Sequence, residues 1–165
     1  MEFRKFWKLL LYTVTAVVSA YSQSPRCGEP QALKFTVLDK GMYSGIVTQR
    51  FAVIRDEATF RLLWSEHTAG RSPAPPVPPL DFSNEMVIAA FAGTKNTAGY
   101  TIKILGVASK DQRLEISLQM NQPGPDCMLS QVLTQPYVVA KTKKVSDPAH
   151  FNLSTTTSPC EGGVN

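Results

Sequence analysis

The hydrophobic pattern of the chain is clearest in residues 81–104. Residues 86–91 form a continuous apolar run, which is typical of a strand buried on both faces. Apolar residues then recur at every second position from Tyr100 to Ile104, so a second strand should have one face toward solvent. Gly93 and Gly99 lie between the two and provide the backbone freedom that a tight reversal needs. We therefore expect a strand, a glycine-rich loop and a second strand.

Other segments predict further strands, at residues 33–38, 51–54, 113–120 and 137–140, with a short last strand near Phe151. Residues 113–120 alternate strictly between apolar and polar side chains, the pattern of a half-buried strand. The turn Asp111-Gln112 precedes it and predicts antiparallel pairing with the strand before. Two short apolar segments, 132–133 and 137–140, are interrupted by Pro136, which favours a sheet edge or a bulge there.

One segment, at about residues 56–68, predicts a helix. Its apolar stripe has the i, i+3, i+4, i+7 spacing and consists of Phe60, Leu63, Trp64 and His67, after a possible N-cap at Asp56. Five prolines between residues 73 and 79 exclude helix and interior strand, so an extended connector follows. Six or more strands and one helix predict a strand-rich α+β fold, either an antiparallel sheet or a sandwich-like domain with the helix packed against it.

The N-terminus has the pattern of a secretory signal peptide over residues 1–20. A basic head precedes a mostly apolar run, and Val18-Ser19-Ala20 offers small residues for cleavage. An uncleaved N-terminal anchor is the alternative. With cleavage, we expect an exported protein, periplasmic or extracellular, without a membrane anchor. Its parts would be an N-terminal tail at 21–32, one domain at 33–152 and a C-terminal tail at 153–165.

The chain has three cysteines: Cys27, Cys127 and Cys160. Export permits a disulfide, and the odd number leaves one thiol over. We expect Cys27 to pair with Cys160, because both lie in the tails, and Cys127 to be a small buried apolar residue. The sequence alone does not choose among the three pairings.

The residue pattern indicates neither an enzyme nor a cofactor site. The sequence contains no nucleophile elbow, zinc-protease motif or phosphate-binding loop, and its cysteines and two histidines lack metal-ligand spacing. The formal net charge of +4 falls to +2 without residues 1–20, since 17 − 3 basic and 13 − 1 acidic residues remain. No basic stripe interleaved with aromatic residues indicates nucleic-acid binding. We expect a non-catalytic protein that binds another protein.

A family resemblance supports this expectation. Residues 81–82 lead into the apolar strand and are followed by Gly93 and Thr97-Ala98-Gly99-Tyr100. This pattern resembles the C-terminal domain family of the protease complex subunit PrcB, in which the motif is Thr-Gly-Gly-Tyr; Ala98 replaces the first glycine here. The resemblance extends over residues 35–143, including Tyr43-Ser44-Gly45-Ile46. It implies a role beside a protease, without enzymatic activity of the chain itself.

The glycine-rich loop and a second aromatic position are the candidate partner-binding surface. Small residues let another backbone approach, and tyrosines are favoured interface anchors. The alternative for Tyr100 and Gly99 is a purely structural role, as a sheet aromatic and a residue with positive φ. The candidate partner-binding residues are Gly93, Lys95, Thr97, Gly99, Tyr100, Pro136 and Tyr137.

Asn96 to Tyr100 is also similar to the Asn-Pro-Thr-Thr-Gly-Tyr loop of chagasin-type cysteine protease inhibitors. Those proteins carry Arg-Pro-Trp in another loop, where this chain has Gln135-Pro136-Tyr137. The resemblance implies a second hypothesis, a protease inhibitor that acts through loops 93–100 and 135–137. A third is that the motif is only structural. The sequence does not identify the partner or the oligomeric state.

Overall fold

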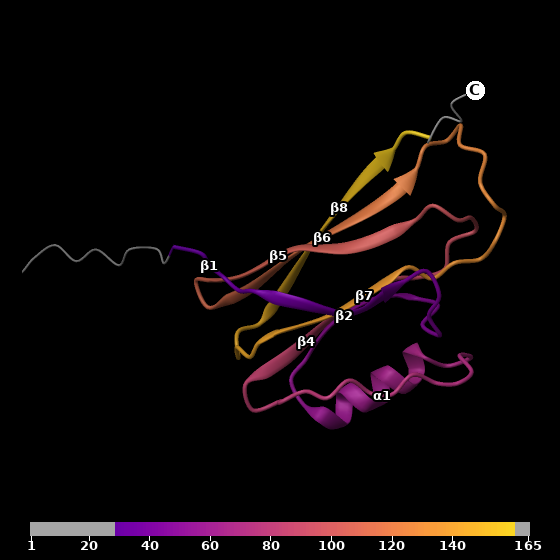
Figure 1. Ribbon diagram of the computed structural model, residues 1–165. Coiled ribbons are helices and arrows are strands. Elements are labelled where there is room, and N and C mark those ends of the chain that lie inside the picture. The colour runs from indigo at the N-terminus through magenta and orange to yellow at the C-terminus, as the bar shows by residue number, and fades with distance from the viewer. Residues whose placement is uncertain (1–28, 161–165) are drawn as a thin grey trace, which may run out of the picture.

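The computed structural model describes residues 29–160, which form two four-stranded sheets and a helix (Figure 1). The first sheet has the strand order β1-β5-β6-β8 and the second β2-β7-β4-β3. In Figure 1 the sheets form two layers, and α1 lies on the outer side of the second sheet. The α+β sandwich-like fold is therefore confirmed. The elements are β1 (Gln31–Ala32), β2 (Phe35–Gly41), β3 (Gln49–Ile54), α1 (Glu57–His67), β4 (Glu85–Ala92), β5 (Thr101–Lys110), β6 (Arg113–Pro123), β7 (Tyr137–Lys143) and β8 (Ala149–Ser158).

Almost all the pairings are antiparallel. Asp111 and Gln112 have φ values of 48° and 59°, and they connect β5 and β6 in the predicted hairpin. Two positive φ angles match the right-handed twist of the flanking strands. The exception is β8, which pairs in parallel with β6 along its whole length, from Leu114↔Ala149 to Pro123↔Ser158.

The strand β4 is buried on both faces, as its apolar run predicts. Alternate residues from Met86 to Ala92 face the first sheet and form the core between the sheets. The others, Val87, Ala89 and Phe91, face the helix and form a second core with Phe60 and Trp64. One continuous apolar strand therefore supplies both cores, because it lies in the middle layer.

The helix α1 has the predicted cap and apolar stripe. The side chain of Asp56 accepts a hydrogen bond from the backbone nitrogen of Thr59 at 2.8 Å, which stabilises the first turn. The buried side chains are the predicted ones, Phe60, Leu63, Trp64 and His67. The proline-rich segment then packs back along the helix, since Trp64 Nε1 donates to the carbonyl of Pro75 at 3.1 Å.

The interpretation of Pro136 is wrong, and some strands are longer than expected. The strand β7 begins after Pro136 and lies centrally between β2 and β4, so the proline marks the start of the strand and neither an edge nor a bulge. The strands reach past residues 33 and 152, since β1 begins at Gln31 and β8 continues to Ser158. The parallel pairing with β6 keeps the polar residues 154–158 in the sheet.

The predicted signal peptide at residues 1–20 lies outside the described residues. Within residues 29–160, no helix has the length and apolar character needed to cross a membrane.

Candidate functional site

Three connecting segments meet at one end of the sandwich, at the right of Figure 1. Residues 42–48 connect β2 and β3 within the second sheet. Residues 93–100 cross from β4 to β5, and residues 124–136 cross from β6 back to β7. The strand registers Gly41↔Tyr137 and Gln49↔Ala92 place all three at the same end. We call these three segments the loop platform.

Backbone hydrogen bonds hold the loop platform together. Lys95 and Thr134 exchange two of them, at 2.8 and 2.9 Å, in an isolated antiparallel bridge. The Thr94 nitrogen donates to the Val47 carbonyl at 2.9 Å, and the Gln135 nitrogen donates to the Met42 carbonyl at 2.7 Å. All three segments are thereby tied to one another, so the loop platform is an ordered continuation of the sandwich.

The glycine at the start of the second segment is required by its backbone. Gly93 has a φ of +73°, which side chains disfavour. A Cβ atom there would also lie 2.8 Å from the Gln49 backbone nitrogen. The predicted reversal after β4 is therefore confirmed, and its cause is close packing of the 93–100 segment against β3.

The predicted partner-binding residues divide into two groups. Gly99 is exposed, and Lys95, Thr97 and Tyr100 are half-buried, with the Lys95 ammonium 5.6 Å from the centre of the Tyr100 ring. The other three residues, Gly93, Pro136 and Tyr137, are buried. These three therefore do not contribute exposed surface to the candidate partner-binding site.

The reason for the burial of Tyr137 is its position at the start of a central strand. Its side chain points into the core beneath α1 and is only 4% exposed. The hydroxyl donates to Asp39 Oδ1 at 3.0 Å and accepts from Arg71 Nη2 at 2.8 Å. In the loop 135–137 of the inhibitor hypothesis, Pro136 and Tyr137 are buried and Gln135 is half-buried.

Exposed apolar side chains mark the loop platform more clearly than the predicted motif does. Of the nine exposed large apolar residues in the described part of the chain, six lie on it. Such a concentration is characteristic of interaction sites on soluble proteins. Sequence reasoning missed it, because these residues lie in irregular segments without a periodic pattern. They are Met42, Tyr43, Val47, Met128, Val132 and Leu133.

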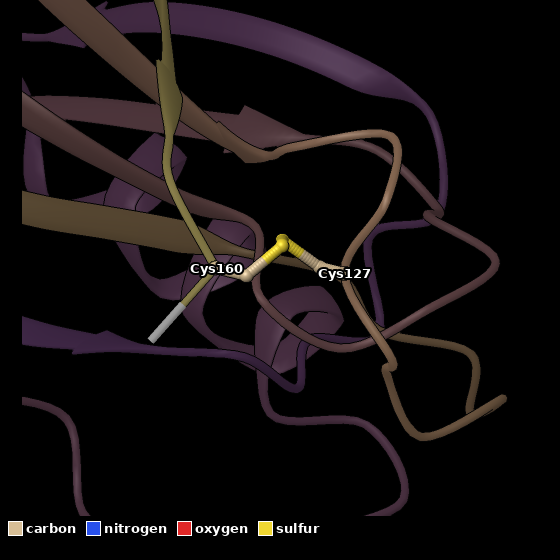
Figure 2. The surroundings of a disulfide bond; sticks show 2 residues. All are labelled: Cys127 and Cys160. Carbon is tan, nitrogen blue, oxygen red and sulfur yellow. A yellow bond between two sulfur atoms is a disulfide. The ribbon is translucent and has the colours of Figure 1, made fainter. Parts of the chain in front are cut away.

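A disulfide closes the outer side of the loop platform (Figure 2). Cys127, in the 124–136 segment, is bonded to Cys160, which follows β8, with 5.1 Å between their Cα atoms. The parallel pairing of β6 and β8 ends at Pro123↔Ser158, so both cysteines leave the first sheet at the same point. The predicted pairing of Cys27 with Cys160 is therefore wrong, as is the prediction of an unpaired Cys127. Cys27 lies outside the described residues.

An open depression of about 640 Å³ lies beside this disulfide. Its wall includes Gly99 from the predicted motif, Leu129 and the fully exposed Met128. The depression thus gives the loop platform a concave part next to its exposed apolar side chains. The remaining lining residues are Asn121, Pro123, Asp126, Cys127, Ser158, Pro159 and Cys160.

A second cluster of polar residues lies beneath the 42–48 segment and has the composition of a catalytic triad. Ser44 Oγ is 2.8 Å from His67 Nδ1, and His67 Nε2 is 3.2 Å from Asp39 Oδ2. Since the Asp39 carboxylate accepts, Nε2 carries the proton and Nδ1 accepts from the Ser44 hydroxyl. In serine hydrolases the two ring nitrogens have the opposite roles.

The surroundings of this cluster favour a structural role. His67 is 0% exposed, and the Ser44 hydroxyl also accepts from the Ile46 backbone nitrogen at 3.1 Å. Gly45 packs against the C-terminal end of α1. Its nitrogen donates to the His67 carbonyl, and a Cβ atom there would collide with the Glu66 carbonyl oxygen. Neither of the two depressions described in the structure is lined by Ser44 or His67.

The electrostatics of the cluster agree with a neutral imidazole beside a carboxylate. Burial lowers the pKa of His67, and this effect outweighs the hydrogen bond with Asp39. Burial alone would raise the pKa of Asp39, but hydrogen bonds from His67, Tyr137 and Arg71 hold it below its ordinary value. Burial raises the pKa of Tyr137. The cluster therefore joins β2, α1 and β7, and the negative charge of Asp39 is compensated by its hydrogen bonds with His67, Tyr137 and Arg71.

Among residues 29–160, no group of three or more histidine, cysteine or acidic side chains is placed to hold a metal ion.

The comparison with protein families gives one match: the family described as PrcB C-terminal, over residues 86–143. This match confirms the resemblance for the segment that contains the 93–100 and 124–136 parts of the loop platform. No curated protein and no solved structure matches the chain.

Proposed function

We propose that this chain is an exported, non-catalytic subunit that binds a protease through the loop platform. The family match supports an association with a protease complex. The observation that carries the assignment to this surface is the location of six of the nine exposed large apolar side chains on the loop platform. Apolar side chains at the centre of an interface supply much of its binding energy, so their solvent exposure in the free chain favours a partner.

The loop platform is suited to binding because it is ordered before the partner arrives. The Lys95–Thr134 bridge and the hydrogen bond from Gln135 to Met42 fix all three segments. The disulfide fixes the outer end of the longest one. A surface that is ordered in advance loses little conformational entropy on association. The half-buried Tyr100, beside Lys95, gives the surface an aromatic part with a polar tip.

The proposed export is supported by the predicted signal peptide and by the disulfide. Disulfides persist in oxidising compartments such as the periplasm and the extracellular space. Cys127 and Cys160 are brought together by the sheet itself. N-terminal sequencing of the secreted protein should give Tyr21 as the first residue, whereas an intact Met1 on a membrane-bound form contradicts the cleavage.

The proposed absence of catalysis rests on the geometry of the Ser44–His67–Asp39 cluster. The hydroxyl of Ser44 is engaged on both sides, and the ring of His67 has no exposed surface. A nucleophile must reach a substrate carbonyl with a base beside it. Here the three groups connect elements of the fold instead.

The proposal is tested by co-purification from the native host with tagged protein. We expect a protease to co-purify with the wild type and to be lost with Leu133→Asp, because Leu133 is 62% exposed on the loop platform. Leu62→Asp is the matched control: Leu62 is 74% exposed, but it lies on α1. Capture of no protease, or equal capture with both variants, contradicts the assignment.

The same purified protein distinguishes a subunit from an inhibitor. It should leave the activity of papain-like and subtilisin-like proteases unchanged at concentrations that saturate its own partner. Inhibition that is abolished by Leu133→Asp and retained in Leu62→Asp would replace the subunit assignment with the inhibitor hypothesis.

A further inference from the structure

The outer edge of β8 differs from every other sheet edge in the described structure. It is ten residues long, and its register with β6 has no bulge. The sequence from Ala149 to Ser158 contains no lysine, arginine, aspartate, glutamate or proline. A long and regular edge without charges lacks the features that normally prevent pairing with another strand.

The other edges carry such features. The strand β1 has only two residues, and the free part of β5 beside it has an exposed Lys103 and a bulge between Ile104 and Gly106. The strand β2 has a bulge after Val37 and is charged. The strand β3 has six residues and includes Arg50. The contrast within one molecule indicates that the edge of β8 serves for pairing.

The hydrogen-bonding direction of β8 follows from its two ends. The carbonyl of Pro148 accepts from the Leu114 nitrogen, and the carbonyl of Ser158 accepts from the Gly124 nitrogen, each at 3.0 Å. Backbone groups of even-numbered residues therefore point toward β6. The N–H and C=O groups of the odd-numbered residues point away from the sheet: Ala149, Phe151, Leu153, Thr155 and Thr157.

Among residues 29–160, the structure gives these outward groups no hydrogen-bond partner in other loops or side chains. The side chains of Phe151 and Leu153 pack against the core while remaining partly exposed, and those of Ala149, Thr155 and Thr157 are exposed. Phe151 also contacts Phe51, with 5.6 Å between ring centroids. The edge thus presents free backbone groups beside incompletely covered apolar side chains.

We propose that β8 pairs with β8 of a second copy of this chain, in antiparallel orientation about a two-fold axis near Leu153. This axis places Phe151 opposite Thr155 of the other copy and Ala149 opposite Thr157, so backbone groups of all five outward residues can pair. An aromatic or apolar residue opposite a threonine is a favourable cross-strand pair. No like charges meet, and the two four-stranded sheets become one continuous sheet.

A second copy fits this edge better than a charged segment of another protein does. The strand β8 offers no charge to attract one, while its own sequence supplies an uncharged partner strand of equal length. The two-fold axis also gives antiparallel pairing, in which opposite residues exchange direct hydrogen bonds. The loop platform lies at the end of the sheets and stays free, because it does not include the middle of β8.

The test is sedimentation equilibrium of the mature, oxidised protein and of variants at one position. Thr155→Pro removes an N–H that points away from β6, so the fold should persist while dimerisation weakens at least about tenfold, the loss expected for one hydrogen bond from each copy. Thr155→Lys keeps the backbone and adds a charge to the edge, and it should also weaken the dimer. Thr155→Val is the matched control and should dimerise like the wild type.

Circular dichroism verifies the fold of each variant. A wild-type protein that stays monomeric up to millimolar concentration overturns the proposal. So does a dimer that persists in folded Thr155→Pro and Thr155→Lys, or one that Leu133→Asp abolishes, because that dimer would form through the loop platform.

Discussion

Mild acid should destabilise the folded protein through one residue, His67. Its ring has no exposed surface and lies against aromatic side chains, with 4.2 Å between its centroid and that of Tyr137. Burial keeps the pKa of His67 below its ordinary value of 6.5, despite the hydrogen bond with Asp39. In mild acid, His67 therefore binds a proton more readily in the unfolded chain than in the folded state.

The sign and size of the effect follow from proton linkage. Above pH 6.5 the histidine is neutral in both states and has no effect on the free energy of unfolding. Below it, the unfolded chain binds one more proton, so stability falls by at most about 1.4 kcal/mol per pH unit until the folded-state pKa is reached. Between pH ~7.5 and pH ~5.0 the loss is thus up to about 2 kcal/mol. Asp39 does not contribute there, because its stabilisation is lost only as the pH falls through 3.8 and below.

The measurement is urea unfolding of the wild type, His67→Gln and His150→Gln at both pH values. His67→Gln should be less stable at neutral pH, yet it should lose most of the wild-type dependence on pH over this interval. His150 is the other histidine and is exposed on β8, so His150→Gln is the matched control and should keep that dependence. If the free energy of unfolding changes equally with pH in the wild type and in His67→Gln, the reasoning is refuted.

Three further predictions concern the loop platform and its support. Replacing both Cys127 and Cys160 by serine should lower the free energy of unfolding by about 3–4 kcal/mol, since the disulfide closes a loop with a sequence separation of 33. A reducing agent should cause the same loss of stability in the wild type. Peptide mapping of the oxidised protein should recover the two linked cysteines. Tyr137→Phe should cost about 1–2 kcal/mol in urea unfolding, because its hydroxyl makes two hydrogen bonds in a buried site, whereas Tyr100→Phe should change stability by less than about 0.5 kcal/mol. Gly93→Ala should lower the melting temperature and cost more than about 1 kcal/mol, because its φ is +73° and the added Cβ meets β3; an unchanged melting temperature would show that the 93–100 segment can move.

The parts of the fold that the sequence predicts are those with a local cause. The apolar run from Met86 to Phe91 can be accommodated only where both faces are covered, and β4 lies in the middle layer. The stripe from Phe60 to His67 has helical spacing, and Asp56 caps the helix. The turn Asp111-Gln112 joins two alternating segments. In each case the information lies within a few residues of the structure that it determines.

The disulfide could not be predicted because its cause is a long-range register. Cys127 and Cys160 meet only because β8 pairs in parallel with β6, after the chain has passed through the other sheet as β7. The polar sequence after Phe151 has no alternating apolar pattern that would indicate such a strand. The Ser44–His67–Asp39 cluster could not be predicted for a similar reason. It joins residues that lie 23 and 28 positions apart in the sequence and meet only in the folded chain.

Proximity in sequence also misled the prediction of the contact surface. Pro136 is the last residue of the loop platform and Tyr137 follows it along the chain, but β7 turns the tyrosine inward at its first residue. Three residues before Tyr137, the backbone of Thr134 is in the bridge with Lys95, and Leu133 before it is exposed. The sequence shows that a loop ends near this point, but only the register of β7 with β2 and β4 decides which side chains face out.

The motif residues and the exposed apolar residues therefore have different tasks in the same segments. Ser44 and Gly45 attach the 42–48 segment to the end of α1, and Gly93 lets the next segment pack against β3. Between and beside these fixed points, Met42, Val47 and Leu133 remain in solvent. A residue whose side chain is already used within the fold cannot also bind a partner without loosening that fold. Specificity for the partner should consequently depend on the exposed apolar side chains, while substitutions in the motif should act on binding only through the stability of the loop platform.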